Sequence, residues 1–378
     1  MAPQRPTGAG ATPIVVDVAA PSPNPPELFG AVDLGTNSCR MLIAHPVGAH
    51  FNVVDSFSKA VHLGHGLEAS GVLATRSMRQ TIQALKICQQ KLNRHAVHTM
   101  RLVATEACRR ARNADSFIAS VYQQTGLQLE VIDPEEEARL AVISCAPLVN
   151  KKTNHLLVVD IGGGSTELVW VDVSEVPCEQ RANAIRGLHA GFQQAPTTNV
   201  QSGSQDNVGA HVVDWISVPF GVATLRDQFV DVDDDAARFA LMSWFFEENL
   251  ADFIPYANEY ARSGFQIIGT SGTVTTVAAS HLGLRRYDRN KVDGFRMTSD
   301  QIDKVIRSYL ELGPAGRSRD PRIGQDRQAL IMSGAAILQA LLRCWPTDRL
   351  TVADRGLREG LLYAQMGAAG VLFESDEA

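Results

Sequence analysis

Residues 155–173, HLLVVDIGGGSTELVWVDV, contain the side chains whose types and spacing most clearly suggest chemistry. An apolar, β-branched run predicts a buried strand that ends at Asp160. The turn that follows consists of Gly162, Gly163, Gly164, Ser165 and Thr166. Three successive glycines leave the backbone N–H groups of such a turn without any Cβ beside them, which suits a bound anion, phosphate above all.

Two acidic residues, Asp160 and Glu167, flank this turn. Carboxylates would repel a bare phosphate, but a hard cation placed between carboxylate and phosphate would bind both. The stretch therefore indicates a site for a phosphate group together with a metal ion. The alternative is a tight structural hairpin whose glutamate is solvated.

The same plan occurs earlier in the chain, in residues 29–46, FGAVDLGTNSCRMLIAHP. An apolar strand ends at Asp33, and a turn of small residues leads into a second strand. This turn consists of Gly35, Thr36, Asn37 and Ser38. The two aspartates are 127 residues apart, about the length of one domain. Two such hairpins predict a duplicated fold whose phosphate-binding turns face each other across a cleft.

An acidic cluster, Asp133 to Glu137, begins a predicted helix. Asp133 is a good N-cap, Pro134 suits the first helical position, and Glu136 completes a capping box. Capping thus explains part of the cluster without any catalytic role. Three consecutive glutamates are more than capping requires, so one of them is a candidate catalytic residue in the cleft.

Two later loops also join a strand to a helix. The first, GTSGT, contributes Gly269, Ser271 and Gly272 as candidate phosphate-binding residues at a helix N-terminus, where anions are favoured. An ordinary strand-to-helix connection is the alternative. The second loop, within residues 349–367, has Asp354 at the end of a predicted strand and a glycine before the helix.

The composition is that of a globular protein and excludes several function classes. Hydrophobic residues make up 45% of the 378 residues, and the net charge of −6 argues against general nucleic-acid binding. The six cysteines form no CxxC pair, so neither a zinc site nor a disulfide framework is predicted, and a reducing, cytoplasmic location is expected. No apolar run reaches the roughly 18 residues of a membrane helix.

The length suits two or three domains. We expect a disordered, proline-rich tail over residues 1–27, a first α/β domain over residues 28–146 and a second over residues 147–370. Within the second domain, the polar segment 178–211 is expected to be an exposed, mobile insertion. The last helix, from about Leu357, is expected to pack back on the first domain.

The order of five motifs resembles the exopolyphosphatase and guanosine-pentaphosphate phosphohydrolase (Ppx/GppA) family. The motifs are AVDLGTNS, VIDPEEEARL, VVDIGGGSTEL, GTSGT and ADRGLREG, and the resemblance covers about residues 29–367. It implies an α/β fold of two duplicated actin-like, ribonuclease H-like domains with a cleft between them, the fold that actin and sugar kinases share. A homodimer is also expected from the family.

The resemblance implies roles for particular residues as well. Arg109 aligns with an arginine that holds phosphate, and Glu137 aligns with the proposed general base. Asp160 and Glu167 would hold Mg²⁺ directly or through water, and a monovalent cation such as K⁺ is a further candidate cofactor. The two small-residue turns would bind phosphate.

The activity that the resemblance implies is Mg²⁺-dependent release of orthophosphate from the end of inorganic polyphosphate. Three alternatives stay open: hydrolysis of guanosine pentaphosphate (pppGpp) at the same site, an ATP-dependent kinase or ATPase of the same superfold, and a sensor without turnover. No nucleic-acid or membrane partner is expected. The chain departs from the family at Asp133-Pro134, where members usually have Ser-Gly, and its 178–211 segment is longer than usual.

Overall fold

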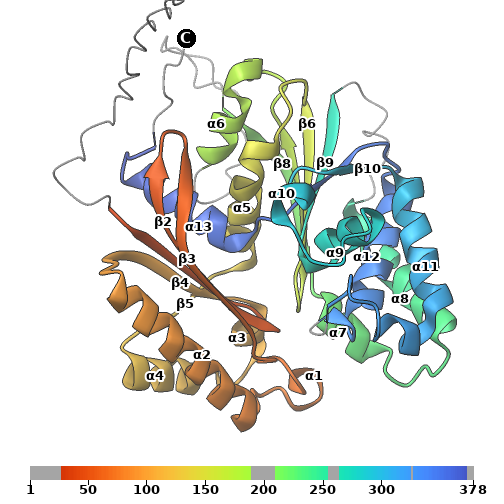
Figure 1. Ribbon diagram of the computed structural model, residues 1–378, viewed down its shortest axis with the longest axis horizontal. Helices are drawn as coiled ribbons and strands as arrows, with labels where there is room; N and C mark the ends of the chain where they lie inside the picture. The colour runs from red at the N-terminus through yellow and green to blue at the C-terminus, as the bar shows by residue number, and fades with distance from the viewer. Residues whose placement is uncertain (1–26, 189–208, 254–263, 325–326, 373–378) are drawn as a thin grey trace, which may run out of the picture.

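The computed structural model describes residues 27–188, 209–253, 264–324 and 327–372. Nearly all of the expected N-terminal tail therefore lies outside the described residues. Within them, the chain forms two sheets, each covered by helices, and the two halves lie side by side (Figure 1).

The first sheet has the strand order β3-β2-β1-β4-β5. Its strands are β1 (Phe29–Leu34), β2 (Ser38–Val47), β3 (His50–Ala60), β4 (Thr99–Ala104) and β5 (Glu130–Val131). The first three strands pair antiparallel, whereas β4 is parallel to β1, and β5 is parallel to β4. The helices of this half are α1 (Leu67–Ser70), α2 (Thr75–Arg94), α3 (Glu106–Arg110) and α4 (Ala114–Thr125). Leu85 of α2 and Phe117 of α4 are buried in the apolar core between these helices and the sheet.

The second sheet has the order β10-β11-β9-β6-β7-β8. Its strands are β6 (His155–Ile161), β7 (Thr166–Asp172), β8 (His211–Val218), β9 (Phe265–Thr270), β10 (Arg296–Met297) and β11 (Leu350–Ala353). As in the first sheet, three consecutive strands, β6, β7 and β8, pair antiparallel. β9 then pairs parallel with β6, and β11 pairs parallel with β9. This repetition is the duplicated actin-like architecture that the sequence predicted.

Helices cover the second sheet on both sides. They are α6 (Arg181–Arg186), α7 (Val222–Gln228), α8 (Asp235–Glu248), α9 (Gly272–His281), α10 (Arg289–Val292), α11 (Ser299–Arg317) and α12 (Ile331–Cys344). The largest apolar cluster lies on the side of α8, α9, α11 and α12. None of the helices within the described residues combines the length and the hydrophobicity needed to cross a lipid bilayer.

Helices α5 (Pro134–Cys145) and α13 (Leu357–Ala368) pack on each other between the two sheets (Figure 1). Val142 of α5 belongs to an apolar cluster with strands of the second sheet. Leu140, on another face of α5, belongs to a cluster that contains Phe29 of β1 and much of α13. α13 therefore completes the core of the first sheet, although it follows the last strand of the second sheet in sequence.

The prediction of an exposed insertion over residues 178–211 is wrong at its start. Cys178–Gln180 forms a 3₁₀ turn that leads into α6, whereas β8 begins only at His211, the last residue of the segment. Arg181 and Ile185 of α6 are buried. Burial of the Arg181 guanidinium is possible because it donates to two backbone carbonyls, which replace the water it loses. Residues 189–208 lie outside the described residues.

The close packing of α13 on α5 gives a matched pair of glycine substitutions. A Cβ on Gly360 would lie 2.1 Å from the backbone oxygen of Leu140, whereas a Cβ on Gly367 would meet nothing within 4 Å. We expect Gly360→Ala to lower the free energy of unfolding by roughly 2 kcal/mol or more, because the two helices must separate. Gly367→Ala, in the same helix, should be neutral or slightly stabilising, because alanine is the better helix former. Urea unfolding of both variants tests this, and equal effects would contradict it.

Candidate active site

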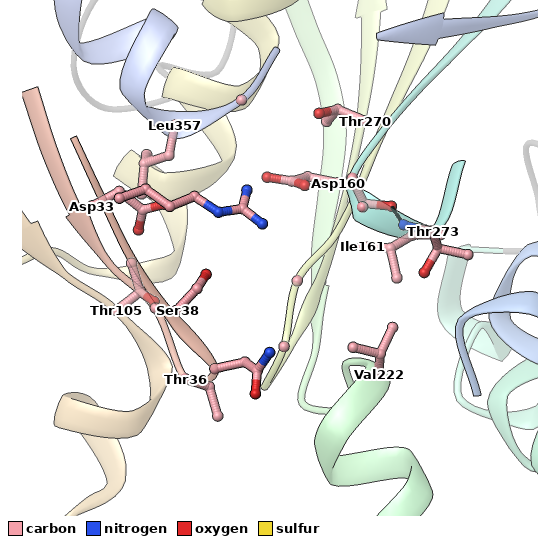
Figure 2. A pocket seen from close by; sticks show the side chains of 18 of the residues that line it. Asp33, Thr36, Ser38, Thr105, Asp160, Ile161, Val222, Thr270, Thr273 and Leu357 are labelled. Atoms are coloured by element: carbon pink, nitrogen blue, oxygen red, sulfur yellow. Dashed lines mark hydrogen bonds between the residues drawn. The ribbon is translucent and has the colours of Figure 1, made fainter. Parts of the chain in front are cut away.

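A cavity of about 320 Å³ lies between the two halves, at the tips of the two hairpins. Asp33 and Asp160, near the ends of β1 and β6, project into it from opposite sides (Figure 2). The lining residues of the first hairpin include Asp33, Gly35, Thr36, Asn37 and Ser38, and those of the second include Asp160, Gly162, Gly163, Gly164 and Ser165. The structure thus brings together the two turns that the sequence indicated.

The two turns have the same backbone hydrogen bond. In the first, the N–H of Gly35 donates to the oxygen of Ser38 at 3.0 Å, and in the second, the N–H of Gly162 donates to the oxygen of Ser165 at 2.9 Å. A Cβ on Gly162 would lie 2.8 Å from that oxygen, so the second turn requires glycine at its first position. The duplication therefore extends to the local geometry of the turns.

Helix α7 binds the carbonyl groups of the second turn. The N–H groups of Val222 and Ala223, at its N-terminus, donate to the carbonyls of Gly162 and Gly163 at 2.9 and 2.8 Å. Because these carbonyl oxygens are engaged, the backbone of the turn offers a ligand chiefly its N–H donors. That balance suits an anion.

The two turns also touch each other. A Cβ on Gly164 would lie 2.5 Å from Oγ1 of Thr36, and a Cβ on Gly163 would lie 3.3 Å from Cβ of the same threonine. At Gly164 this approach requires a residue without a Cβ, and at Gly163 a Cβ would be tightly packed. Thr36 Oγ1 is buried and has no hydrogen-bond partner in the described part of the chain, so an unsatisfied polar group lies where the turns meet.

Asp160 and Glu167 face each other as a cross-strand pair of β6 and β7. Burial raises the pKa of each to about 7; repulsion from Glu137 and Asp33 adds to the effect on Asp160, and repulsion from Asp160 adds to the effect on Glu167. Glu167 is only 1% exposed and does not itself line the cavity. Its Oε1 accepts a hydrogen bond from Ser217, whereas its Oε2 has no partner within the described residues.

These two carboxylates fit a cation. No group of three or more His, Cys, Asp or Glu side chains in the described ranges could hold a metal ion. Mg²⁺, however, keeps several of its waters and is usually bound by one or two carboxylates together with phosphate oxygens. Asp160, which lines the cavity, and the buried Glu167, which is repelled by Asp160 and has one unpartnered oxygen, match that donor set.

Glu137 lines the cavity from the first turns of α5 and is bound by Arg109 of α3. Arg109 Nη1 donates to Glu137 Oε2 at 2.8 Å, while its Nε and Nη2 donate to Glu106 Oε2 at 3.1 and 2.9 Å. Burial raises the pKa of Glu137 well above its ordinary value, and Glu167 adds to this, against the opposing effect of Arg109. Arg109 itself does not line the cavity, but both of its carboxylate partners, Glu106 and Glu137, do.

The remaining residues of the acidic cluster begin α5. Asp133 is the N-cap, and its side chain accepts from the N–H of Glu136 at 2.8 Å, as predicted. The predicted capping box is wrong, because the Glu136 carboxylate binds Arg139 and Arg101 instead of the N-cap N–H. These ion pairs leave Glu137 as the member of the cluster that reaches the cavity.

The third predicted loop lines the cavity along all but its first residue. Thr270, Ser271, Gly272 and Thr273 belong to the lining, and Ser271 Oγ caps α9. Gly269 does not line the cavity, because it lies inside β9 and pairs with strands on both sides. The GTSGT segment is therefore a turn over only part of its length.

Thr166, in the second hairpin, does not line the cavity either, because its hydroxyl is buried and donates to the oxygen of Phe220.

Four arginines line the cavity without having been predicted as site residues. They are Arg40, Arg327, Arg355 and Arg358. Arg40 could have been found, because it stands two residues after Ser38 in β2, and alternate residues of a strand share a face. Together these side chains place positive charge beside the carboxylates.

Solved structures of known proteins share this fold. A Ppx/GppA family member from Aquifex aeolicus is 28% identical, with a TM-score of 0.69, and the match covers 91% of this chain and 99% of that one. An exopolyphosphatase from Cytophaga hutchinsonii is 22% identical, with a TM-score of 0.73, and the match covers 92% of this chain and 100% of that one; at that identity the likeness concerns the fold alone.

The sequence itself matches the model of the Ppx/GppA phosphatase family over residues 42–185 and 197–369. The match includes the second hairpin, the acidic cluster with Glu137, and both later loops. It leaves out the first hairpin turn but covers the other elements that line the cavity. This chain belongs to the Ppx/GppA phosphatase family.

Proposed function

We propose that this phosphatase hydrolyses the terminal phosphoanhydride of inorganic polyphosphate and releases orthophosphate. The observation that carries the proposal is the meeting of two N–H-rich turns and the Glu137 carboxylate in one cavity. Phosphoryl transfer depends on positioned phosphate, neutralised charge and an oriented water molecule. The turns and the arginines would supply the first two, and Glu137 would supply the third.

Glu137 is the proposed general base. A general base works best when its pKa is close to the working pH, and burial raises the pKa of Glu137 in that direction. Arg109 holds one carboxylate oxygen, Oε2, so the other remains available to a water molecule. Arg109 would then act by orienting Glu137 and, once substrate arrives, by binding phosphate as the family resemblance implies.

The character of the lining favours a chain of phosphates over a nucleotide. Among the described residues that line the cavity, none is aromatic, whereas glycines, hydroxyl groups and arginines are numerous. Polyphosphate needs only charge and N–H donors along its length, while a nucleobase is most often bound by stacking. This difference supports polyphosphate as the preferred substrate.

We further propose that Asp160 and Glu167 hold a Mg²⁺ ion, directly or through water. A bound Mg²⁺ would neutralise charge on the phosphate oxygens. The contribution of the chain is to place the two carboxylates as neighbours on adjacent strands, so that their repulsion is relieved when a cation binds.

Hydrolysis of pppGpp at the same site is the second candidate, and Tyr287 is the observation that favours it. The Tyr287 side chain is 48% exposed. Burial raises the pKa of its hydroxyl, and so does Asp354, a residue that lines the cavity. A half-exposed ring at the edge of a phosphate site could stack on guanine.

Replacing Glu137 tests the proposed base. We expect Glu137→Gln to lower kcat on polyphosphate by roughly 10²–10⁴, because the amide cannot take a proton from water. The variant should melt at a temperature no lower than the parent, because burial already disfavours the charged carboxylate. Glu135→Gln, two residues earlier in the same helix and not part of the lining, is the matched control and should keep its activity. Near-parental turnover by Glu137→Gln would remove it from this role.

The carboxylate pair predicts a pH-dependent response to Mg²⁺. An acid whose pKa is higher in the folded protein than in the unfolded chain loses its proton more easily after unfolding. Ionisation therefore lowers the free energy of unfolding as the pH rises from the unfolded-state pKa to the folded-state pKa. Raising the pKa of Asp160 from 3.8 to about 7 lowers the free energy of unfolding by roughly 4 kcal/mol once the pH exceeds 7. In chelator, the melting temperature should therefore fall between about pH 4 and pH 7 and then level off.

Adding Mg²⁺ at about pH 8 should restore part of this loss. Glu167→Gln should show a smaller fall with pH and a smaller gain from Mg²⁺, because one of the repelling charges is gone. The control is Glu175→Gln, an exposed glutamate just beyond β7, which should behave like the parent. An identical Mg²⁺ response in Glu167→Gln and the parent would exclude this glutamate from the cation site. Thermal melts followed by circular dichroism give all of these values.

A paired assay of phosphate release from polyphosphate and from pppGpp separates the two candidate functions. If guanine stacks on Tyr287, Tyr287→Leu should raise KM for pppGpp roughly fivefold or more while leaving KM for polyphosphate within about twofold. Tyr287→Phe keeps the ring and is the control. If neither variant changes KM for pppGpp, Tyr287 does not bind the base.

A further inference from the structure

We propose that His62 is a positioning residue that turns the side-chain amide of Asn37 so that its NH₂ group faces the cavity. His62 Nδ1 lies 2.7 Å from Asn37 Oδ1, and Asn37 is one of the residues that line the cavity. The inference rests on the proposed function to the extent that the cavity binds phosphate. It adds a residue outside the lining that determines how the first turn meets an anion.

The segment that carries His62 binds the first turn as α7 binds the second. The N–H groups of Val61 and His62 both donate to the oxygen of Asn37, at 2.9 and 3.0 Å, and the N–H of Gly64 donates to the oxygen of Thr36 at 2.9 Å. A Cβ on Gly64 would lie 2.4 Å from Thr36 Cγ2, so the approach is close. These bonds fix the backbone of Asn37 and bring the imidazole to its side chain.

The backbone of His62 is in a conformation that few residues other than glycine adopt, although histidine, asparagine and aspartate do so more often than the rest. Its φ is +49°, in the left-handed region, which costs a residue with a Cβ about 1 kcal/mol or more. Glycine would adopt this conformation without that cost. A histidine kept in a strained position, with its ring nitrogen on a residue of the site, is the pattern expected when the side chain has a task there.

The task follows from the two ends of an amide. The Asn37 side chain can bind a phosphate oxygen only through its NH₂ group, because its carbonyl oxygen would face another electron-rich oxygen. A donor on the opposite side settles which way the amide points. In the tautomer that carries its proton on Nδ1, His62 is such a donor: it would bind Oδ1, 2.7 Å away, and leave both N–H groups of Asn37 for the cavity.

Two substitutions of nearly equal shape test this. Asparagine and aspartate both tolerate positive φ, and both place a polar atom near the position of Nδ1, but asparagine can donate there and aspartate only accepts. We expect His62→Asp to raise KM for polyphosphate, and the inhibition constant of inorganic phosphate, at least tenfold, with a smaller change in kcat. His62→Asn should stay within about threefold of the parent in both constants. Equal affinities in the two variants would overturn the proposal.

The added negative charge of aspartate needs its own control. If His62 acts through Asn37, the difference between His62→Asp and His62→Asn should vanish when Asn37 is also changed to alanine. If the difference persists in the double variants, the effect is general repulsion and the proposal fails. Melting temperatures of all variants exclude unfolding as the cause.

Direct binding of inorganic phosphate, measured by calorimetry, separates this inference from the proposed function. Should the parent protein fail to hydrolyse polyphosphate, the proposed function fails, yet the phosphate affinities of the two His62 variants still decide the role of His62. Tight phosphate binding by His62→Asn together with weak binding by His62→Asp would support the inference under either outcome. Equally tight binding by both variants would contradict it.

Discussion

Repulsion among the carboxylates around the cavity is the constraint on which the site depends. Asp33, Glu137, Asp160 and Glu167 all have raised pKa values, because burial disfavours their charged forms and the groups repel one another. Such a cluster opposes folding unless protons or cations neutralise it. Arg109 does so only in part, since it is shared between two glutamates. This uncompensated charge is the reason for proposing that phosphate binds here together with a cation, beside the arginines that line the cavity.

The duplicated fold supplies the geometry that this cluster requires. The same strand order in each half places a hairpin turn at the same edge of each sheet, and the two edges meet at the cavity. Helix α5 joins the halves, so its first turns face the cavity while its later residues are buried between the sheets. Glu137 stands at this boundary because Asp133 fixes where the helix begins. Position in the fold, more than local sequence, makes this one glutamate of three a site residue.

Local sequence was sufficient wherever backbone geometry determined the outcome. The glycine turns, the aspartates before them and the Asp133 cap all follow from rules about residues without a Cβ and about helix ends. Sequence failed where a distant partner determined the outcome. Glu136 binds arginines instead of capping, and Gly269 is held inside a sheet by neighbouring strands. His62 gave no signal, because its conformation and its contact with Asn37 exist only once β2 and β3 are paired.

The packing of α13 has a consequence for the order in which the protein can assemble during synthesis. The side chain of Gln365 donates to the backbone oxygen of Gly30, a residue 335 positions earlier, and the apolar side of α13 covers β1. On the ribosome, the first sheet must wait with that surface open to solvent until nearly every other described element has been made. Closing so long a loop is entropically costly and slow. The nascent chain is thus exposed to aggregation through its earliest strands, and a chaperone that shields apolar surface would be most useful to it during that interval.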